Sequence, residues 1–549
     1  MSPSIRSIVV ALVLGAVLAP SAAQANPTQM SIMMDDDLLV YRDDSTAAQT
    51  LTKMKSLGVD TVRVTVLWKT VAEYAKFSKA DLARLKGKKY RRARETALRQ
   101  NKRFKPANPR TYPVRNWDRY DNLVRAAAER GIRVYFNVTG PGPAWAHEKK
   151  PKGSKALQST YKPRPREFKQ FVTAVGKRFD GTFRDENGSR SLLPRVTMWS
   201  LWNEPNQGGW LSPQWETRGG KKVPASPALF RKLYQSGYQG LVASGHRADN
   251  EIILLGETAP LGSDEQTAKS PMRPKQFIRE LFCIRPDGTP YSGADARVRA
   301  CSDLEKAPLT ASGYAHHPYT KNLPPTEADP SPDALTMANI TDLGTTLDEM
   351  AEKTSAVPTG LPLYMTEYGF ETNPPDPFSG VPLATQAKFN TIGEFLAWSN
   401  PRIASQAQFL LADVPPVRGR SKTSKSYWFT YQSGLFFQRG QPKPAAYAYA
   451  FPFTATPTVA DPVTGLPTFH LWGQLRFLAN GAPDVVQIQF RPTDGSADWL
   501  TVGDPVAVDT FGYFEADRVP PSPSPGEWRG VWLRPDGSIG STSIGADGT

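Results

Sequence analysis

The sequence reads TVRVTVLW at residues 61–68, and this stretch predicts a β-strand because it is rich in β-branched residues. A helix is predicted just before it, since Leu51, Met54 and Leu57 recur at helical spacing and Gly58 follows them. An apolar strand beside an amphipathic helix is the unit from which α/β proteins with parallel sheets are built.

The same unit recurs along the chain as far as residue 455. We predict strands at 30–34, 61–68, 133–138, 196–202, 252–255, 315–317, 363–367 and 406–411. The predicted helices are 50–57, 120–129, 168–179, 229–243, 277–283, 343–352, 385–399 and one from 445. Eight units within about 420 residues favour an α/β fold of the (β/α)8 barrel type over an open doubly wound sheet. No G-x-G-x-x-G follows an early strand, so dinucleotide binding has no support.

The pattern changes after Thr456, where helical periodicity ends. Strands at 469–477, 485–490 and 527–533 are separated by turn residues, which is typical of an antiparallel β-sandwich. We therefore divide the chain into a barrel at 26–455 and a small accessory sandwich at 456–549. The sandwich either binds glycan or covers one side of the barrel, and the structural role is favoured.

The N-terminus predicts export. Arg6 precedes the 12-residue apolar run 8–19, and Ala23-Gln24-Ala25 forms an A-x-A site. A bilayer span needs roughly 20 apolar residues, so this run is too short to cross a membrane. We expect a signal peptide at 1–25, cleavage after Ala25, and a secreted monomer with no membrane span.

The chain has two cysteines, Cys283 and Cys301. In an exported protein such a pair predicts a disulfide, and the alternative is two free thiols. Closing a loop of this length stabilises the fold by about 3 kcal/mol in the chain-entropy model.

The formal charge of +15 is concentrated in one insertion. Residues 76–110 hold 7 Lys and 7 Arg against Asp81 and Glu95, a net charge of +12. Export argues against a nucleic-acid partner, which leaves an acidic polysaccharide or an anionic cell envelope. A solvated basic helix that aids solubility is the alternative.

Two carboxylates follow predicted strands. Glu204 lies in WSLWNEPN at 199–206, and Glu367 lies in YMTEYG at 364–369. A (β/α)8 barrel gathers all strand C-termini on one face, so the two side chains are expected to share a pocket. Glycosidic bond cleavage needs such a pair, with one group protonated and the other ionised, and a separation of about 5–5.5 Å gives retention. The alternative for a single Glu after a strand is an ordinary salt bridge.

These two motifs resemble known sequences. WNEPN and MTEYG look like the fourth- and seventh-strand motifs of clan A glycoside hydrolases, and the order of elements agrees over roughly residues 30–455. The resemblance implies Glu204 as acid/base, Glu367 as nucleophile, and double displacement on β-linked poly- or oligosaccharide. PAWA at 143–146 and HPY at 317–319 are most similar to family 39, with family 5 next.

Four further residues match the clan pattern. The resemblance implies that Asn203 binds the sugar 2-hydroxyl and that Arg63 keeps the nucleophile ionised, as a nearby cation favours a carboxylate. A barrel-core Arg paired with another acid is the alternative for Arg63. His317 and Tyr319 alternate correctly to share one face near the nucleophile, whereas His316 is expected to point away.

Aromatic residues near strand ends are candidate sugar platforms. Trp145 and Trp210 are predicted to contact substrate, and Trp68 is a weaker candidate, with a buried core role as the alternative for each. Many clan members carry a tryptophan on the eighth strand, but residues 406–413 contain none. Trp428 follows in a basic loop, and its place is open. The identity of the sugar therefore stays open.

No cofactor or metal is predicted, because the five histidines form no spaced ligand set. An esterase is disfavoured because no G-x-S-x-G elbow occurs. Two rivals to a hydrolase remain. A transglycosylase would use the same covalent intermediate, and a non-catalytic glycan-binding envelope protein would keep the barrel without its chemistry.

Overall fold

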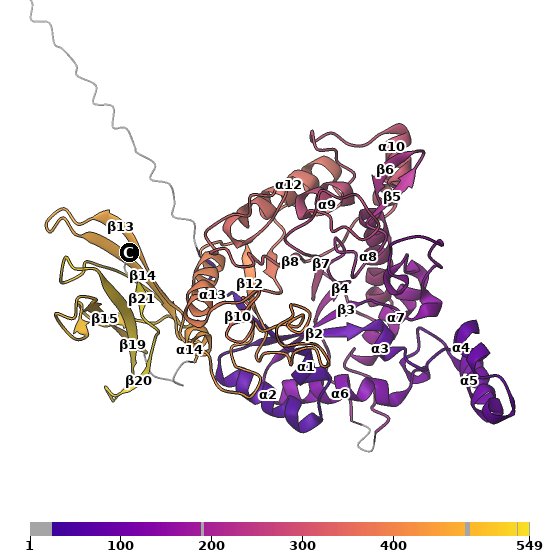
Figure 1. The fold of residues 1–549 in the computed structure, drawn as a ribbon, viewed down its shortest axis with the longest axis horizontal. Coiled ribbons are helices and arrows are strands. Elements are labelled where there is room, and N and C mark those ends of the chain that lie inside the picture. The colour runs from indigo at the N-terminus through magenta and orange to yellow at the C-terminus, as the bar shows by residue number, and fades with distance from the viewer. Residues whose placement is uncertain (1–24, 188–190, 478–483, 535, 548–549) are drawn as a thin grey trace, which may run out of the picture.

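The computed structural model describes residues 25–187, 191–477, 484–534 and 536–547 (Figure 1). Eight parallel strands close into a barrel, each paired with the next along the chain and the last with the first. The strands are β1 (Met30–Met34), β2 (Thr61–Leu67), β3 (Arg133–Thr139), β4 (Met198–Leu201), β7 (Ile252–Thr258), β8 (Gly313–His316), β9 (Leu363–Met365) and β12 (Ile403–Phe409). The predicted (β/α)8 barrel is confirmed, and each predicted strand overlaps one of these.

One principal helix follows each barrel strand and covers the outside of the barrel (Figure 1). These helices are α2 (Asp44–Ser56), α6 (Val114–Glu129), α7 (Pro165–Arg178), α8 (Ser226–Val242), α9 (Pro274–Leu281), α12 (Thr341–Thr354), α13 (Leu383–Trp398) and α14 (Pro444–Ala450). α2 begins six residues before the predicted start at 50, because the Asp43 carboxylate caps it by accepting a hydrogen bond from the Thr46 backbone N–H at 2.9 Å. Apolar periodicity does not report such a polar first turn.

The barrel is filled by side chains rather than open. A buried cluster inside it takes one residue from each of seven strands: Ile32, Tyr135, Met198, Leu254, Ala315, Tyr364 and Ala407. A second, larger core lies between the strands and the surrounding helices. This packing closes the bottom of the barrel and leaves the strand C-termini as the end that can hold a site.

Shorter elements decorate the connections. They are α1 (Asp36–Val40), α3 (Trp68–Val71), η3 (Ala144–Ala146), η4 (Gln158–Thr160), β5 (Trp215–Arg218), β6 (Lys221–Pro224), α10 (Gly293–Val298), α11 (Ser302–Lys306), η5 (Met337–Asn339), β10 (Thr372–Asn373) and β11 (Val381–Pro382). β5 and β6 form a hairpin, and β10 and β11 form a short parallel pair.

The basic insertion forms a helical arm between β2 and α6, which we call the basic hairpin (residues 76–110). Its elements are α4 (Lys79–Arg84), η1 (Lys88–Tyr90), α5 (Arg91–Arg103) and η2 (Pro109–Thr111). It projects from the barrel on the side away from the C-terminal domain (Figure 1). Ala97 is the only buried residue of α5, so most of the hairpin faces solvent.

The C-terminal domain contains two antiparallel sheets, as predicted. One sheet has the order β13 (Phe453–Ala460), β14 (Pro467–Gln474), β18 (Tyr513–Arg518). The other contains β15 (Val485–Pro492), β16 (Leu500–Thr501), β17 (Val506–Ala507), β19 (Gly526–Leu533), β20 (Ile539–Thr542) and β21 (Ala546–Asp547). Aromatic and aliphatic residues of both sheets form one shared core. The predicted boundary at 455/456 falls inside β13.

The sandwich packs against the barrel through α13 and α14 (Figure 1). Trp398 of α13 lies against Trp472 and Tyr513 of the sandwich, with ring centroids 5.5 and 5.8 Å away. Arg476 adds a buried ion pair to Glu394 of α13 at 2.8 Å. This apolar and ion-paired contact supports the structural role predicted for the domain, whereas glycan binding by it stays a prediction.

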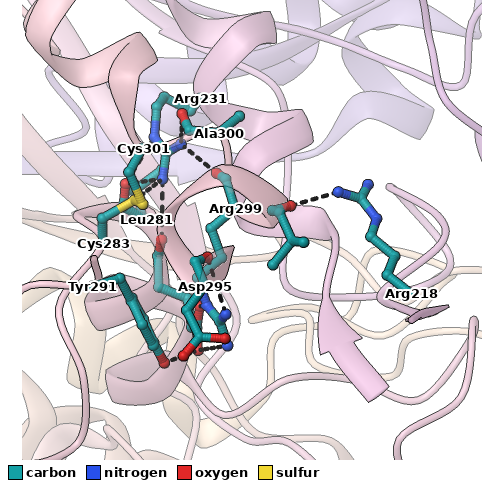
Figure 2. The surroundings of a disulfide bond; sticks show 11 residues. Arg218, Arg231, Leu281, Cys283, Tyr291, Asp295, Arg299, Ala300 and Cys301 are labelled. Carbon is teal, nitrogen blue, oxygen red and sulfur yellow. Dashed lines mark hydrogen bonds and ion pairs between the residues drawn. A yellow bond between two sulfur atoms is a disulfide. The ribbon is translucent and has the colours of Figure 1, made fainter. Parts of the chain in front are cut away.

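Cys283 and Cys301 form a disulfide, which confirms the predicted pairing. Arg231 of α8 is fully buried beside it and donates hydrogen bonds to the carbonyls of Leu281, Arg299 and Ala300 (Figure 2). The bridge and Arg231 together fasten the loop between α9 and β8 to the barrel wall.

The predicted signal peptide lies outside the described residues apart from Ala25, so cleavage after Ala25 stays a prediction. Across the described ranges, no helix has both the length and the apolar character that a membrane crossing requires.

Candidate active site

A cavity of about 900 Å³ opens at the C-terminal ends of the barrel strands. Its lining comes from the ends of β1, β2 and β12 and from the loops after β4, β8, β9 and β12. Pockets of roughly 300–1,000 Å³ are typical of small-molecule sites, and this end of the barrel is where such sites form. Both Glu204 and Glu367 line the cavity, as the sequence predicted.

Glu204 follows β4 and Glu367 follows β9, on opposite sides of the cavity floor. The side-chain oxygens of the two glutamates and a ring nitrogen of His317 lie within 4.8 Å of one another. Glu204 has φ 37°, a left-handed conformation that non-glycine residues seldom adopt. Its backbone N–H donates to the Glu257 carbonyl at 2.9 Å, which holds the strained turn in place.

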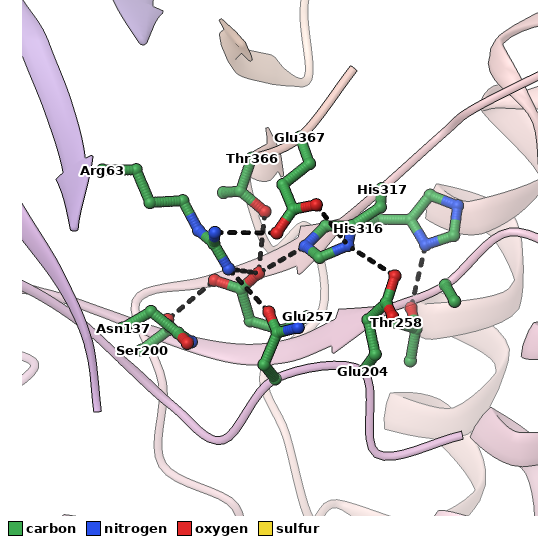
Figure 3. A network of polar contacts seen from close by, with 12 residues as sticks. Arg63, Asn137, Ser200, Glu204, Glu257, Thr258, His316, His317, Thr366 and Glu367 are labelled. Carbon is green, nitrogen blue, oxygen red and sulfur yellow. Dashed lines mark hydrogen bonds and ion pairs between the residues drawn. The ribbon is translucent and has the colours of Figure 1, made fainter. Parts of the chain in front are cut away.

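Arg63 of β2 lies beneath the cavity and is fully buried. Its guanidinium donates to Glu367 Oε1 at 2.8 Å, to Asn203 Oδ1 at 2.7 Å and to Glu257 Oε2 at 2.9 Å (Figure 3). The predicted contact with Glu367 is therefore present. The alternative role, pairing with another acid, is present as well through Glu257.

Glu257 is a site residue that the sequence reasoning missed. It lies at the end of β7 and is fully buried. Its carboxylate accepts from Ser200 Oγ at 2.7 Å, Thr366 Oγ1 at 3.0 Å, His317 Nε2 at 2.6 Å, Arg63, and the Tyr135 hydroxyl. Burial opposes its ionisation, but Arg63, His317 and Tyr135 outweigh burial and hold the pKa of Glu257 well below its usual range.

His317 connects the three glutamates (Figure 3). Its Nε2 contacts Glu257 Oε2 at 2.6 Å, while its Nδ1 lies 3.1 Å from Glu204 Oε1 and 3.6 Å from Glu367 Oε2. Burial opposes the positive charge, but Glu367, Glu204 and Glu257 outweigh it and raise the pKa of His317 to about 10. The three carboxylates around the ring therefore favour its imidazolium form. We call Arg63, Glu204, Glu257, His317 and Glu367 the carboxylate network.

The other predicted polar residues either face the cavity or point away from it, as the strand alternation predicts. The Tyr319 hydroxyl donates to Glu367 Oε2 at 3.1 Å, and Asn203 lines the cavity. His316 points away and contacts Thr258 Oγ1 at 2.8 Å and the Leu335 carbonyl at 3.0 Å. Burial lowers the pKa of His316 to about 3, so it is neutral and structural.

The predicted aromatic platforms have different surroundings. Trp210 lines the cavity. Trp145 is not among the lining residues; its ring packs on Trp68 and Phe104 with centroids 6.2 and 5.6 Å away, so its contact with sugar stays a prediction. Trp68 is fully buried and has the core role that was its alternative.

The eighth barrel strand supplies an aromatic residue that the search for tryptophan overlooked. Phe409 ends β12 and lines the cavity together with Tyr431 from the following loop. The two rings meet edge to face at 5.1 Å. Trp428, the suggested substitute, lies outside the cavity lining and packs on Tyr427 at 4.9 Å.

Two groups of described side chains come close enough to share a metal ion: Glu204, His317 and Glu367, and Asp121, Asp185 and Glu186. Ion pairs account for both. In the first group, His317 Nδ1 lies 3.1 Å from Glu204 and 3.6 Å from Glu367. In the second group, Arg178 and Arg125 pair with the carboxylates.

No protein-family model matches this chain, and no curated protein sequence matches it. Solved structures are similar in fold. A monomeric β-xylosidase from Caulobacter crescentus CB15 aligns with 14% identity and a TM-score of 0.46, over 91% of this chain and 98% of that one. A glucosidase from Croceicoccus marinus gives 11% and 0.44 over 91% and 98%, and an endo-β-1,4-mannanase from Thermotoga petrophila gives 12% and 0.38 over 96% and 98%. At these identities and TM-scores no activity is transferred, so the function has to follow from the site.

Proposed function

We propose that this protein is a retaining glycoside hydrolase that cleaves β-glycosidic bonds of a poly- or oligosaccharide. The observation that carries the proposal is the approach of Glu204 and Glu367 across one cavity, where one carboxylate oxygen of each lies within 4.8 Å of the other. Retaining enzymes hold their two carboxyl groups about 5–5.5 Å apart, whereas inverting enzymes need about 6.5–9.5 Å to admit a water. Membership of family 39 stays a prediction from the sequence motifs.

Each half of the reaction has an assigned residue. Glu204, protonated, donates its proton to the departing glycosidic oxygen while Glu367 attacks the anomeric carbon and forms a glycosyl ester. Glu204, now ionised, takes a proton from water as that water displaces Glu367. Arg63 and Tyr319 hold the attacking carboxylate in place through their hydrogen bonds to its two oxygens.

Asn203 has a defined orientation in this scheme. Its Oδ1 accepts from Arg63 at 2.7 Å, which leaves the amide NH2 to donate to the sugar 2-hydroxyl. That contact strengthens in the transition state of glycoside hydrolysis.

The test is a panel of polysaccharides and aryl glycosides with wild type, Glu204→Ala and Glu367→Ala. General-acid loss is worth ~10²–10⁴-fold, so we expect at least that fall in kcat for Glu204→Ala on substrates with poor leaving groups. Glu367→Ala should be inactive until azide is added and should then form a glycosyl azide of inverted configuration. Glu349→Ala, an exposed carboxylate paired only with Lys353 on α12, is the matched control. Full activity in either active-site variant would overturn the proposal.

The same panel of substrates and variants distinguishes the two alternative functions, a transglycosylase and a non-catalytic glycan-binding protein. A transglycosylase would convert oligosaccharides into longer products with the same dependence on Glu204 and Glu367. A non-catalytic binder would retain glycan with unchanged affinity in both variants and release no product from any substrate.

We further propose an anionic or cell-envelope glycan as substrate, because all Lys and Arg of the basic hairpin except Lys76 are exposed. The cavity itself is lined by Asp36, Asp329 and Glu371 beside Lys321 and Lys425. The anionic groups of such a polymer would therefore lie on the hairpin rather than beside the reacting sugar. Export is proposed too, and the disulfide is compatible with an oxidising compartment.

A further inference from the structure

The carboxylate network contains five ionisable groups whose charges have to balance, because it is almost closed to water. Arg63, His317 and Glu257 have side chains that are at most 1% exposed, and those of Glu367 and Glu204 are 11% and 20% exposed. Unpaired charge in such a place is costly, so a reaction that moves charge between Glu204 and Glu367 needs a counter-charge that serves both.

We propose that Glu257 is a positioning residue that keeps His317 as an imidazolium, and that the His317 Nδ1 proton serves Glu367 and Glu204 in turn. This inference rests on the proposed retaining mechanism. Its geometric basis is that one ring nitrogen is fixed by Glu257 while the other lies between the two reacting carboxylates.

The contacts divide the ring into a fixed side and a shared side. On the fixed side, Nε2 donates to Glu257 Oε2 at 2.6 Å, and Arg63 and Thr366 donate to the same oxygen. On the shared side, Nδ1 lies 3.1 Å from Glu204 and 3.6 Å from Glu367. A small shift of either carboxylate therefore passes the Nδ1–H hydrogen bond from one to the other.

The charges balance at both stages when His317 is protonated. Before the first step Glu204 is a neutral acid, and Glu257 and Glu367 as carboxylates balance Arg63 and His317. In that step the glycosidic oxygen takes the Glu204 proton and Glu367 becomes a neutral ester, so Glu204 carries the negative charge instead. Water then restores the first state. His317 gives up no proton in either step, and the network stays neutral throughout.

Glu257 is the carboxylate that contacts the His317 ring and keeps its negative charge at both stages of this scheme. Glu204 and Glu367 each lose their charge at one stage, whereas Glu257 is buried beneath them and out of reach of the sugar. Of the other groups near the ring, His316 is neutral, Tyr135 and Tyr319 are phenols, and Arg63 is a cation. Asp36 interacts with Arg63 and Glu367 from the cavity wall, where it accepts from the Thr65 backbone N–H at 3.1 Å, and no hydrogen bond or ion pair among the described residues joins it to the His317 ring. The low pKa of Glu257 agrees with this arrangement.

The experiment compares wild type with Glu257→Gln, which keeps the shape of the side chain and removes its charge. The ¹⁵N and ¹H shifts of the histidine rings are followed by NMR as the pH rises, and a His317→Gln spectrum assigns the ring. In wild type we expect His317 to stay doubly protonated beyond about pH 8. In Glu257→Gln its titration should move down by at least ~1 pH unit, and Glu257→Asp should restore part of the shift.

Kinetics supply the second readout. The alkaline limb of the kcat/KM profile of Glu257→Gln should move to lower pH with the titration of His317, and kcat should fall by ~10²-fold with little change in KM. Glu251→Gln is the matched control, since Glu251 also pairs with a buried histidine, His246, at 2.8 Å and with Arg195, away from the cavity. It should leave the pH profile unchanged.

The outcomes keep the two proposals apart. A neutral His317 in wild type at about pH 8, or a titration that does not change in Glu257→Gln, overturns this inference even if the enzyme hydrolyses glycans. If no glycan is hydrolysed, the proposed function fails while the NMR still reports on Glu257 and His317. Should Glu257→Gln not fold, the wild-type titration alone decides: a protonated ring at about pH 8 supports the role, and a neutral ring refutes it.

Discussion

Two regions of this molecule carry dense charge, and they treat it in opposite ways. In the carboxylate network Arg63, Glu257, His317 and Glu367 are buried and have several partners, and Glu257 alone accepts from five donors. In the basic hairpin the cations outnumber the acids by twelve, and all but Lys76 are exposed. The first region neutralises its charges within the protein, whereas the second leaves its charge to be neutralised by ions or by another molecule.

This difference in pairing and exposure suits the carboxylate network to catalysis and the basic hairpin to attracting a charged polymer. Charges in a dry, paired network interact strongly and are held in fixed geometry, which is what a reaction that moves charge needs. Charges on an exposed helix are screened within about 10 Å at moderate ionic strength, so they act on polymers through their number rather than their placement. Substitutions in the network should therefore change activity and stability strongly, whereas substitutions in the hairpin should change only the binding of charged substrates.

The largest effect is expected from Arg63→Met. This change removes the donors to Glu367, Asn203 and Glu257 at once and leaves a buried carboxylate without its cation. Removing one partner of a buried pair costs ~3–5 kcal/mol, and we expect a loss of that size in the free energy of unfolding. Activity should fall by at least ~10²–10³-fold, because the preorganised contacts to the nucleophile are lost. Urea unfolding and kcat measured on the same preparation check both.

Arg63→Lys is its control. A lysine keeps the charge but lacks the planar fork that reaches three oxygens, so activity should recover only in part while stability recovers more. Equal activity in Arg63→Met and wild type would show that the network has no part in the reaction.

Arg178→Met is expected to have a smaller effect, because it should lower stability without changing kcat. Arg178 is as buried as Arg63 and pairs with Asp121 at 2.5 Å and Glu186 at 2.8 Å, but these contacts lie between α6 and α7, away from the cavity lining. The free energy of unfolding should again fall by ~3–5 kcal/mol. The kcat of the folded protein should stay at the wild-type value, measured well below the melting temperature. A fall in kcat here would mean that burial of charge, rather than position in the network, sets activity.

The sequence supports the fold better than it supports the network. β-branched strands and amphipathic helices repeat often enough to predict the barrel, and a carboxylate directly after an apolar strand is a recognisable signal. Glu204 and Glu367 carry that signal; Arg63 was predicted from its resemblance to the clan pattern, and His317 also from strand alternation. Alternation also assigns His316 to the outside, as the structure has it.

Glu257 was missed for a physical reason. The apolar run of β7 ends at Leu255, and the register against β8 then shifts between Gly256 and Thr258. Gly256 has φ 107°, and a Cβ there would lie 2.6 Å from the Ala315 carbonyl, so only glycine fits. Alternation cannot be counted across such a bulge, and it is the bulge that directs Glu257 into the barrel. A glycine inside a strand is the one local signal for it.

The direction of aromatic side chains in loops was also predicted poorly, because it depends on the path of the loop, and a loop has no sequence periodicity from which that path could be predicted. Trp145 follows β3 in the expected motif, yet its ring packs on Trp68 and the insertion residue Phe104. Phe409 fills the eighth-strand position that was searched only for tryptophan. The positions of the strands are therefore predictable from this sequence, whereas the direction of an aromatic side chain in the following loops is predicted less well.

The smallest effect on the folded protein is expected from neutralising the hairpin. We propose Lys88→Gln, Lys89→Gln, Arg91→Gln and Arg92→Gln together, all of them exposed residues on η1 and the start of α5. Stability should be unchanged within the error of unfolding measurements, since exposed substitutions seldom matter. KM for an anionic polysaccharide should rise several-fold and lose part of its salt dependence, because the hairpin attracts the polymer through screened charge. Hydrolysis of a short neutral aryl glycoside should be unaffected. An equal change on charged and neutral substrates would refute recruitment and leave the hairpin as a solubilising helix.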